Sequence, residues 1–395
     1  MDKTNKHSSI WNPAFISACA IGMLLNISKQ MSNSIISVYV NTLVDSAAIV
    51  GLVASAFSVS AIVFKLFSGA ALDTFNRRNI LSISMVALSI AFLGYGLSKT
   101  VSTVVVFRFL QGAAQAFTAT CLLTMVADAL PADKFSSGIG VFTLVEGISS
   151  AIGPTLGLKC VGYIGYNNTF ILCSAIMLAS AFSALLYRMP FERKNKFRIT
   201  IDKIFSPKCL LFAVILFAFN FTNCVVHSFL VIFSGLQNVT GNIGLYFTLN
   251  ALALMVTRPL MGKLTDKFGI VKVAIPGMCA FIASFWIISY AGNLATFLMA
   301  SIVSAFGFGA CQPAIQALCM KCVPKEERGV ASNTCYIAQD FGNLLGPVAS
   351  GLIVESFGYG NMWRIMTIPI VIGVIYTFAI RKKIGEVERK FIEEA

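Results

Sequence analysis

The chain has 395 residues, of which 57% are hydrophobic and only 12% are charged, and its mean hydropathy is +0.80. Soluble globular domains carry about 25% charged residues, so this composition excludes a soluble fold. The net charge of +13 does not indicate a nucleic-acid partner, because the basic residues are concentrated in short connections between apolar runs.

The apolar residues form twelve runs of about 20 residues or more, the length that a helix needs to cross a bilayer. Inside lipid each run must be helical, because no water is present to satisfy open backbone groups. The runs predict an all-α integral membrane protein with 12 transmembrane helices. In chain order they are 13–38, 46–71, 79–98, 102–127, 135–162, 167–187, 208–234, 242–263, 270–290, 294–320, 328–355 and 361–380.

The second half of the chain repeats the first at a constant offset of 193 residues. The segment 65–76 reappears as 258–269 without an insertion. The repeat predicts two six-helix bundles related by a pseudo-twofold axis, with a site between them, which is typical of transporters. Further matched positions are Pro131 with Pro324, Gly153-Pro154 with Gly346-Pro347, and Gly165-Tyr166 with Gly358-Tyr359.

The charge distribution predicts the orientation and the domain boundaries. Placing both termini in the cytoplasm puts most of the 30 lysines and arginines on the inner side, as the positive-inside rule requires. We expect an N-terminal six-helix bundle over 1–190, a basic cytoplasmic linker over 191–207, and a C-terminal six-helix bundle with a cytoplasmic tail over 208–395. The protein should be a monomer in the cytoplasmic (inner) membrane.

A glycine and an acid precede a basic pair where the second run ends, in the pattern Gly69-x-x-x-Asp73 followed by Arg77-Arg78. The glycine lets two helices approach, and the acid can pair with a neighbouring helix end in one conformation only. A basic loop that merely sets topology is the alternative. A second copy favours a conformational gate; it comprises Gly262, Asp266 and Lys267.

Ionisable residues inside the bilayer are costly and are candidates for function. Lys29 and Arg108 are expected at a similar depth in the first bundle, and Lys29 lies beside a polar helical face. Lys29 either contacts an anionic group on a substrate or extends to the outer surface without a specific role. The polar face comprises Asn26, Gln30, Asn33 and Ser37.

Glu146 and Asp340 are the acidic candidates for carrying a proton. Glu146 lies near the midplane of the fifth run, and its repeat partner is Gln339. Glu146 also shares a helical face with Ser149 and Gly153, so a buried structural glutamate is the competing interpretation. Asp340 leaves the same two interpretations open.

Polar residues also follow one face of the seventh and tenth runs, where they are expected to complete the wall of a cavity. Asn220, Asn223 and His227 lie on the seventh run, and Gln312 and Gln316 on the tenth. We interpret His227, close to the outer end, as a solvated histidine without a specific role.

Three motifs together resemble those of the major facilitator superfamily. The segments 69–78 and 262–269 resemble its motif A, and Arg108-Phe109-Leu110-Gln111-Gly112 resembles its motif B. Gly140, Gly153-Pro154 and Gly157 resemble motif C, which is associated with twelve-helix drug:proton antiporters. Thr74, Asn76, Ser149 and Leu158 depart from these motifs.

The resemblance implies alternating access, a central cavity lined by helices 1, 4, 7 and 10, and a part for Arg108 in proton coupling. We predict a secondary transporter for a small organic, anionic or amphipathic molecule, working by proton-coupled efflux antiport. A proton symporter that imports an organic anion is the alternative. An enzyme is not expected, because the motifs H-E-x-x-H and G-x-S-x-G are missing from the sequence.

The expected partners are the substrate, protons and the lipid bilayer. No cofactor and no metal site are expected, and the eleven cysteines are interpreted as small apolar packing residues. The predicted substrate-binding residues are Lys29, Gln30, Asn33, Arg108, Gln111, Asn220, Asn223 and Gln312. The predicted proton-coupling residues are Arg108, Glu146 and Asp340. The predicted gate comprises Gly69, Asp73, Arg77, Arg78, Gly262, Asp266, Lys267, Gly153 and Pro154.

Overall fold

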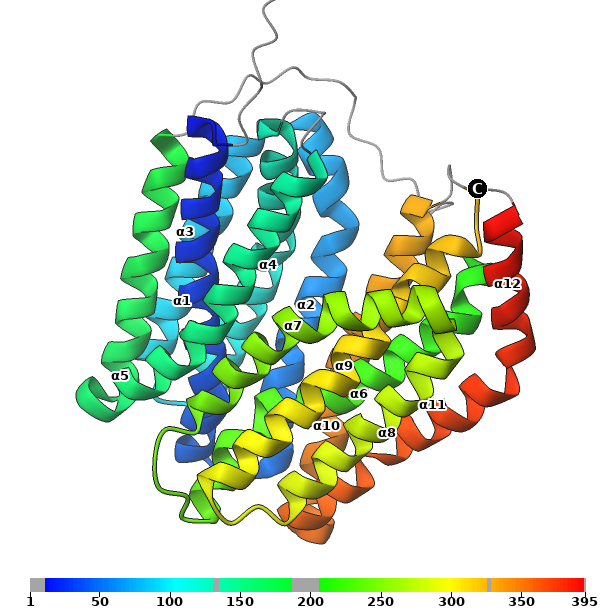
Figure 1. Cartoon of the computed structure of the whole chain (residues 1–395). Coiled ribbons are helices and arrows are strands. Elements are labelled where there is room, and N and C mark those ends of the chain that lie inside the picture. Colours follow the sequence, from blue (N-terminus) through cyan, green and yellow to red (C-terminus); the bar gives the residue numbers. More distant parts are fainter. Residues whose placement is uncertain (1–10, 131–134, 187–205, 325–327, 394–395) are drawn as a thin grey trace, which may run out of the picture.

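The computed structural model describes the chain apart from residues 1–10, 131–134, 187–205, 325–327 and 394–395. The described residues form helices and no strands (Figure 1). The helices are α1 (Pro13–Leu43), α2 (Ala47–Thr74), α3 (Arg77–Leu97), α4 (Val101–Ala129), α5 (Phe135–Leu186), α6 (Pro207–Leu236), α7 (Gly244–Phe268), α8 (Ile270–Ser289), α9 (Leu294–Lys321), α10 (Arg328–Ile365), α11 (Ile368–Ala379) and α12 (Arg381–Glu393).

Two of the helices are each broken by one glycine in a left-handed conformation. Gly165 interrupts α5 and Gly358 interrupts α10, and both have φ of 77°. Only glycine adopts this backbone conformation without strain, so the chain can turn between two helical segments there. The two glycines are related by the offset of 193 residues, so the repeat in the sequence is also a repeat in backbone geometry.

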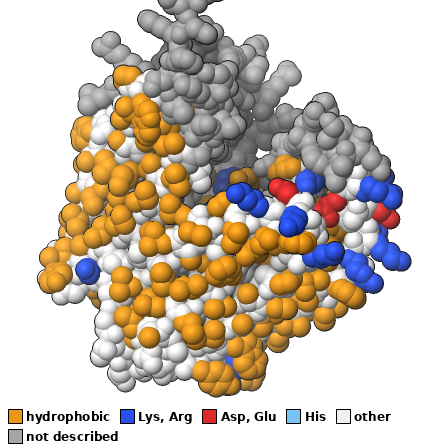
Figure 2. Space-filling view, in the orientation of Figure 1, with side chains coloured by type: hydrophobic (Ala, Val, Ile, Leu, Met, Phe, Trp, Pro, Cys, Tyr) orange, Lys and Arg blue, Asp and Glu red, His pale blue; other side chains and the backbone are white. Residues whose placement is uncertain are grey.

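Among the described residues, eight helical segments are long and apolar enough to cross a membrane. Two of them, Val141–Leu185 with 45 residues and Thr334–Ala379 with 46, are about twice the length that one crossing requires, and each contains a glycine turn. Hydrophobic side chains are spread over the described part of the face shown in Figure 2. An integral membrane protein is therefore confirmed, whereas the count of twelve spans stays a prediction.

The helices form two bundles, one built from α1 to α5 and one from α6 to α11 (Figure 1). In the first bundle α1 and α3 pack against α5, and in the second α6 packs against α10 and α8 against α9. Aromatic rings pack edge to face in both interiors: the ring centroids of Tyr95 and Phe170 lie 5.4 Å apart in the first, and those of Phe285 and Trp363 lie 5.4 Å apart in the second. The bundles touch through α2 with α10 and through α5 with α7.

The bundles are closed against each other where α2 begins, which we call the Ala47 end. A Cβ atom added to Gly244 of α7 would lie 2.7 Å from Cα of Thr155 in α5, so the two backbones are in direct contact. Asn242 donates a 3.3 Å hydrogen bond from its side chain to the Thr155 carbonyl oxygen. Gly51 of α2 lies closer still to α10, because a Cβ atom added to it would overlap the Pro347 carbonyl oxygen. Small residues therefore seal this end of the molecule.

The last described residues of the chain form a helix, α12, that the sequence analysis did not predict. Residues after 380 were expected only as a tail, but α12 packs against α8 and α9, and its Ile384 is fully buried. Glu388 of α12 accepts a 3.0 Å hydrogen bond from the backbone N–H of Ile270 at the start of α8. In the first bundle the equivalent helix α3 is capped by its own Asn76. Gly269 takes that place before α8, so the cap comes from α12 instead.

Candidate functional site

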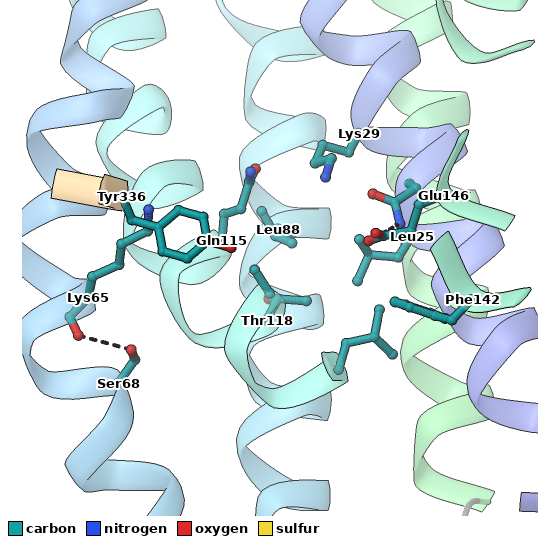
Figure 3. A pocket seen from close by; sticks show the side chains of 13 residues that line it. Leu25, Lys29, Lys65, Ser68, Leu88, Gln115, Thr118, Phe142, Glu146 and Tyr336 are labelled. Carbon is teal, nitrogen blue, oxygen red and sulfur yellow. Dashed lines mark hydrogen bonds between the residues drawn. The ribbon is translucent and has the colours of Figure 1, made fainter. Parts of the chain in front are cut away.

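Predicted site residues line two cavities, and the larger of these two has a volume of about 530 Å³. It lies mainly in the first bundle, and Tyr336 of α10 lines it from the second (Figure 3). Its lining residues lie at mid-depth or toward the end at which α1 begins, which we call the Pro13 end. The charged side chains of Lys29, Lys65 and Glu146 line it, together with polar side chains that include Gln115. The cavity thus combines both signs of charge with apolar walls.

Lys29 and Glu146 reach this cavity from α1 and α5. Both side chains project into it (Figure 3). Unlike Lys65, which pairs with Asp340, Lys29 does not form a short ion pair with Glu146. Asn26, one turn before Lys29, donates hydrogen bonds to the Gly22 carbonyl at 3.0 Å and to Glu146 Oε1 at 3.5 Å. Lys29 therefore faces the cavity rather than the outer surface, and Glu146 keeps capacity to accept a further hydrogen bond or a proton.

Arg108 does not line this cavity but lies buried between α1 and α4. Its Nη1 donates to Gln111 Oε1 at 2.7 Å and to Asn33 Oδ1 at 3.2 Å, and Gln111 donates to the same Asn33 oxygen at 3.1 Å. Tyr95 completes the group by donating to Gln111 Oε1 at 2.6 Å. The network ties α1, α3 and α4 together one turn away from Lys29, so it can hold the lysine's helix in position.

The small residues that resemble motif C, among them Gly153 and Gly157, pack α5 against α1. A Cβ atom on Gly153 would lie 2.6 Å from Cβ of Gln30, and one on Gly157 would lie 2.8 Å from the Met31 carbonyl oxygen. Ser149 on the same face is fully buried, and Gln30 donates to Ser150 at 3.1 Å. This is the helix-packing face that the sequence indicated, and it lies within one bundle.

A second cavity of about 200 Å³ lies between the bundles, nearer the Ala47 end. Gln30 and Asn33 line it from the first bundle, and Asn223 and His227 from α6 of the second. His227 is exposed to this cavity and stacks on Phe247 with ring centroids 5.5 Å apart, so it is less isolated than expected.

The other predicted residues of the second bundle do not line either cavity. Asn220 is buried and donates to the Leu216 carbonyl of its own helix at 2.9 Å. Gln312 donates to Gln339 of α10 at 3.2 Å. Asp340 pairs with Lys65 of α2 across the bundles. The helices expected as numbers 1, 4, 7 and 10 correspond to α1, α4, α6 and α9 of the structure. Of these four, α1 lines both cavities, α4 lines the larger one, and α6 and α9 line the smaller one.

The predicted gate residues are only partly described. The surroundings of Gly69 and the side chain of Asp73 lie outside the described part of the structure. Arg78 donates to the carbonyl of Leu185 within the first bundle. In the second copy, no described atom lies within 4 Å of a Cβ atom added to Gly262.

The remaining gate positions are also exposed or make contacts within one bundle. Asp266 is exposed, and Lys267 lies 5.2 Å from the ring centroid of Phe268. The Arg77 carbonyl accepts a 3.0 Å hydrogen bond from the Cys121 thiol. Pro154 is buried and lines the second cavity.

Sequence reasoning did not select Lys65, Gln115 or Tyr336 as cavity residues. Lys65 is the first residue of the repeated segment 65–76, and a cation inside an apolar run could have marked it as a candidate. Gln115 is one turn beyond Gln111, but its buried Oε1 without a hydrogen-bond partner becomes visible only in the structure.

Known transporters resemble the chain over nearly its full length. It is 22% identical to an uncharacterised MFS-type transporter from Methanocaldococcus jannaschii, over 93% of this chain and 96% of that one. It is 21% identical to Multidrug resistance protein 1 from Bacillus subtilis, over 92% and 93% of the two chains. It is 23% identical to the Staphylopine export protein from Staphylococcus aureus, over 88% and 92%.

Solved structures share the fold. The nucleoside transporter NupG superposes with a TM-score of 0.80 at 14% identity, over 94% of this chain and 100% of that one. A bacterial homologue of the lysosomal transporter Spinster superposes with a TM-score of 0.76 at 16% identity, over 95% and 97%. The family model described as Major Facilitator Superfamily matches residues 18–241 and 210–394. The chain therefore belongs to the major facilitator superfamily and is a multi-pass membrane transporter, not an enzyme.

Proposed function

We propose that this transporter exports a small organic molecule, anionic or amphipathic, across the cytoplasmic membrane in exchange for protons. The observation that supports the proposal most directly is the cavity of about 530 Å³ that contains Lys29 and Glu146 inside an apolar bundle. Charged groups at such depth are expensive to keep and indicate a path for ions or charged substrates.

Lys29 and Glu146 are assigned different roles in this proposal. Lys29 binds an anionic group of the substrate, because an ammonium exposed to a cavity attracts anions strongly when little water is present. Glu146 carries the proton, and Asn26 keeps its carboxylate in place through the 3.5 Å hydrogen bond. Arg108 acts as a positioning residue, since it reaches Asn33 on the helix that carries Lys29.

Alternating access would arise from rocking of the two bundles about the substrate. The backbone contact between Gly244 and Thr155 closes the Ala47 end, and the larger cavity lies toward the Pro13 end. With both termini in the cytoplasm, this arrangement is the state that accepts substrate from the cytoplasm. The relatives named for multidrug resistance and for staphylopine export favour the outward direction of transport.

Transport in inverted membrane vesicles tests the proposal. A proton gradient that is acid inside should drive accumulation of substrates from a panel of anionic, neutral and cationic dyes. Lys29→Ala should lose the anionic dyes, whereas Lys159→Ala, at an exposed position in α5, should behave like the wild type. If the wild type does not accumulate dye in inverted vesicles, but takes it up in right-side-out vesicles that are acid outside, the import alternative is established instead.

A further inference from the structure

An ion pair joins the two bundles at the edge of the larger cavity. Lys65 Nζ of α2 lies 2.6 Å from Asp340 Oδ2 of α10. The two residues are 275 positions apart in the chain, so the contact exists only because the bundles are packed together. Any relative movement of α2 and α10 has to lengthen or break it.

The lysine of this pair can be reached from the cavity. Lys65 lines the cavity, and so does Tyr336, one helical turn before Asp340 on α10 (Figure 3). The side chain of Lys65 is 40% exposed and that of Asp340 is 20% exposed. A ligand in the cavity therefore has direct access to the ammonium group, from the side that Asp340 leaves open.

The pair is suited to exchange rather than to permanent stabilisation. Ion pairs with this much exposure contribute little to stability, because solvent screens the charges and the long side chain loses freedom when it is fixed. An ammonium group offers three hydrogen-bond donors, and an anionic oxygen of a ligand satisfies them as well as Asp340 does. Replacing one carboxylate by another at Lys65 is thus nearly balanced in free energy.

The repeat does not provide a second copy of this ion pair at the equivalent positions. The position equivalent to Lys65 is Arg258, which preserves the positive charge. The position equivalent to Asp340 is Gly147, which has no side chain, and a Cβ atom there would meet only Met255 at 3.6 Å. The cation has a counterpart across the pseudo-twofold axis, but the competing acid does not.

We propose that Lys65 is an anion-binding residue of the cavity, and that Asp340 occupies it when substrate is absent. An organic anion with a carboxylate, phosphate or sulfonate group displaces Asp340, and the same event releases the contact between α2 and α10. Substrate binding is thereby linked to freedom of the bundles to move. This inference rests on the proposed function only in treating the cavity as the substrate site.

Equilibrium binding of two matched fluorescent probes to the purified protein tests the inference. Dansylglycine carries a carboxylate, and dansylamide is a neutral compound with the same fluorophore. Asp340→Asn removes the competitor, so it should tighten dansylglycine binding about tenfold. Lys65→Met keeps the apolar stem and should weaken the same binding about tenfold, and dansylamide should change less than twofold in both variants.

The double variant Lys65→Asp/Asp340→Lys serves as the control for the bundle contact. It keeps an ion pair but moves the ammonium to α10, so it should retain wild-type thermal stability without restoring dansylglycine binding. Unchanged or weaker dansylglycine binding in Asp340→Asn would overturn the inference. Equal changes for both probes, or failure of dansylglycine to bind the wild type and Asp340→Asn, would do the same.

No proton gradient is needed for these binding measurements. Failure of proton-driven export therefore leaves the binding result standing, and failure of the binding result leaves export standing.

Discussion

Gly244 offers a direct test of the closed Ala47 end, because it is where α7 touches α5. An alanine there would place its Cβ atom 2.7 Å from Cα of Thr155, about 0.7 Å short of the 3.4 Å at which ordinary contact begins. The nearest atom, Thr155 Cα, belongs to the backbone, so a side-chain rotation cannot relieve this overlap. Overpacking of this kind costs about 1–3 kcal/mol, and 1.4 kcal/mol changes a two-state equilibrium about tenfold.

Gly244→Ala should therefore raise the population that is open at the Ala47 end about tenfold. Spin labels at Tyr163 and Tyr290, exposed positions at this end of the two bundles, report the change as a longer distance component. Attaching the labels through an unnatural amino acid avoids the eleven native cysteines. Gly235→Ala is the matched control, because nothing lies within 4 Å of its added Cβ atom. A distance distribution identical to wild type in Gly244→Ala would refute the closed contact.

Three other substitutions test separate parts of the account. Glu146→Gln keeps the acceptor for Asn26 but cannot carry a proton, so vesicles should lose pH-driven accumulation and keep substrate exchange; retained pH-driven accumulation would contradict its assigned role. Arg108→Lys keeps the charge without the guanidinium geometry and should slow transport about tenfold or more, and wild-type rates would show that the network is dispensable. Glu388→Ala removes the cap of α8 and should cost about 1 kcal/mol of stability, seen as a lower melting temperature, whereas the exposed Glu386→Ala should not; equal melting temperatures would exclude the capping role.

The repeat predicted the fold well, because it records backbone geometry. Gly165 and Gly358 are equivalent by the offset of 193 and take the same left-handed conformation. Glycine is needed at such a turn wherever the fold has it, so the requirement is visible in one sequence. The packing face of α5 was also predictable, because Gly153 and Gly157 recur at helical spacing.

The contacts within the site were harder to predict because they join residues that are remote in the chain. Lys65 and Asp340 are separated by 275 positions, and no local pattern marks them as partners. The depth of Arg108 was predicted, but its burial against Asn33 depends on how far α1 and α4 approach.

The cysteines also make contacts that could not be predicted from their spacing in the sequence. They appear scattered along the chain, yet Cys209 Sγ lies 3.5 Å from Cys322 Sγ, at a point where α6 meets the end of α9. Cys319 adds its carbonyl oxygen to the same group, as the acceptor for the Cys209 thiol at 3.3 Å. Sequence separation therefore conceals a cluster that helix packing creates.

The central claim is that substrate and protons cross the membrane in opposite directions, and it can be measured directly. The purified protein is reconstituted in liposomes that contain a pH-sensitive dye, and a substrate gradient is imposed without a pH gradient. Inward movement of substrate should make the lumen more alkaline in wild-type liposomes and leave the pH unchanged with Glu146→Gln. Acidification of the lumen as substrate enters would show that proton and substrate move together, and would contradict export by antiport.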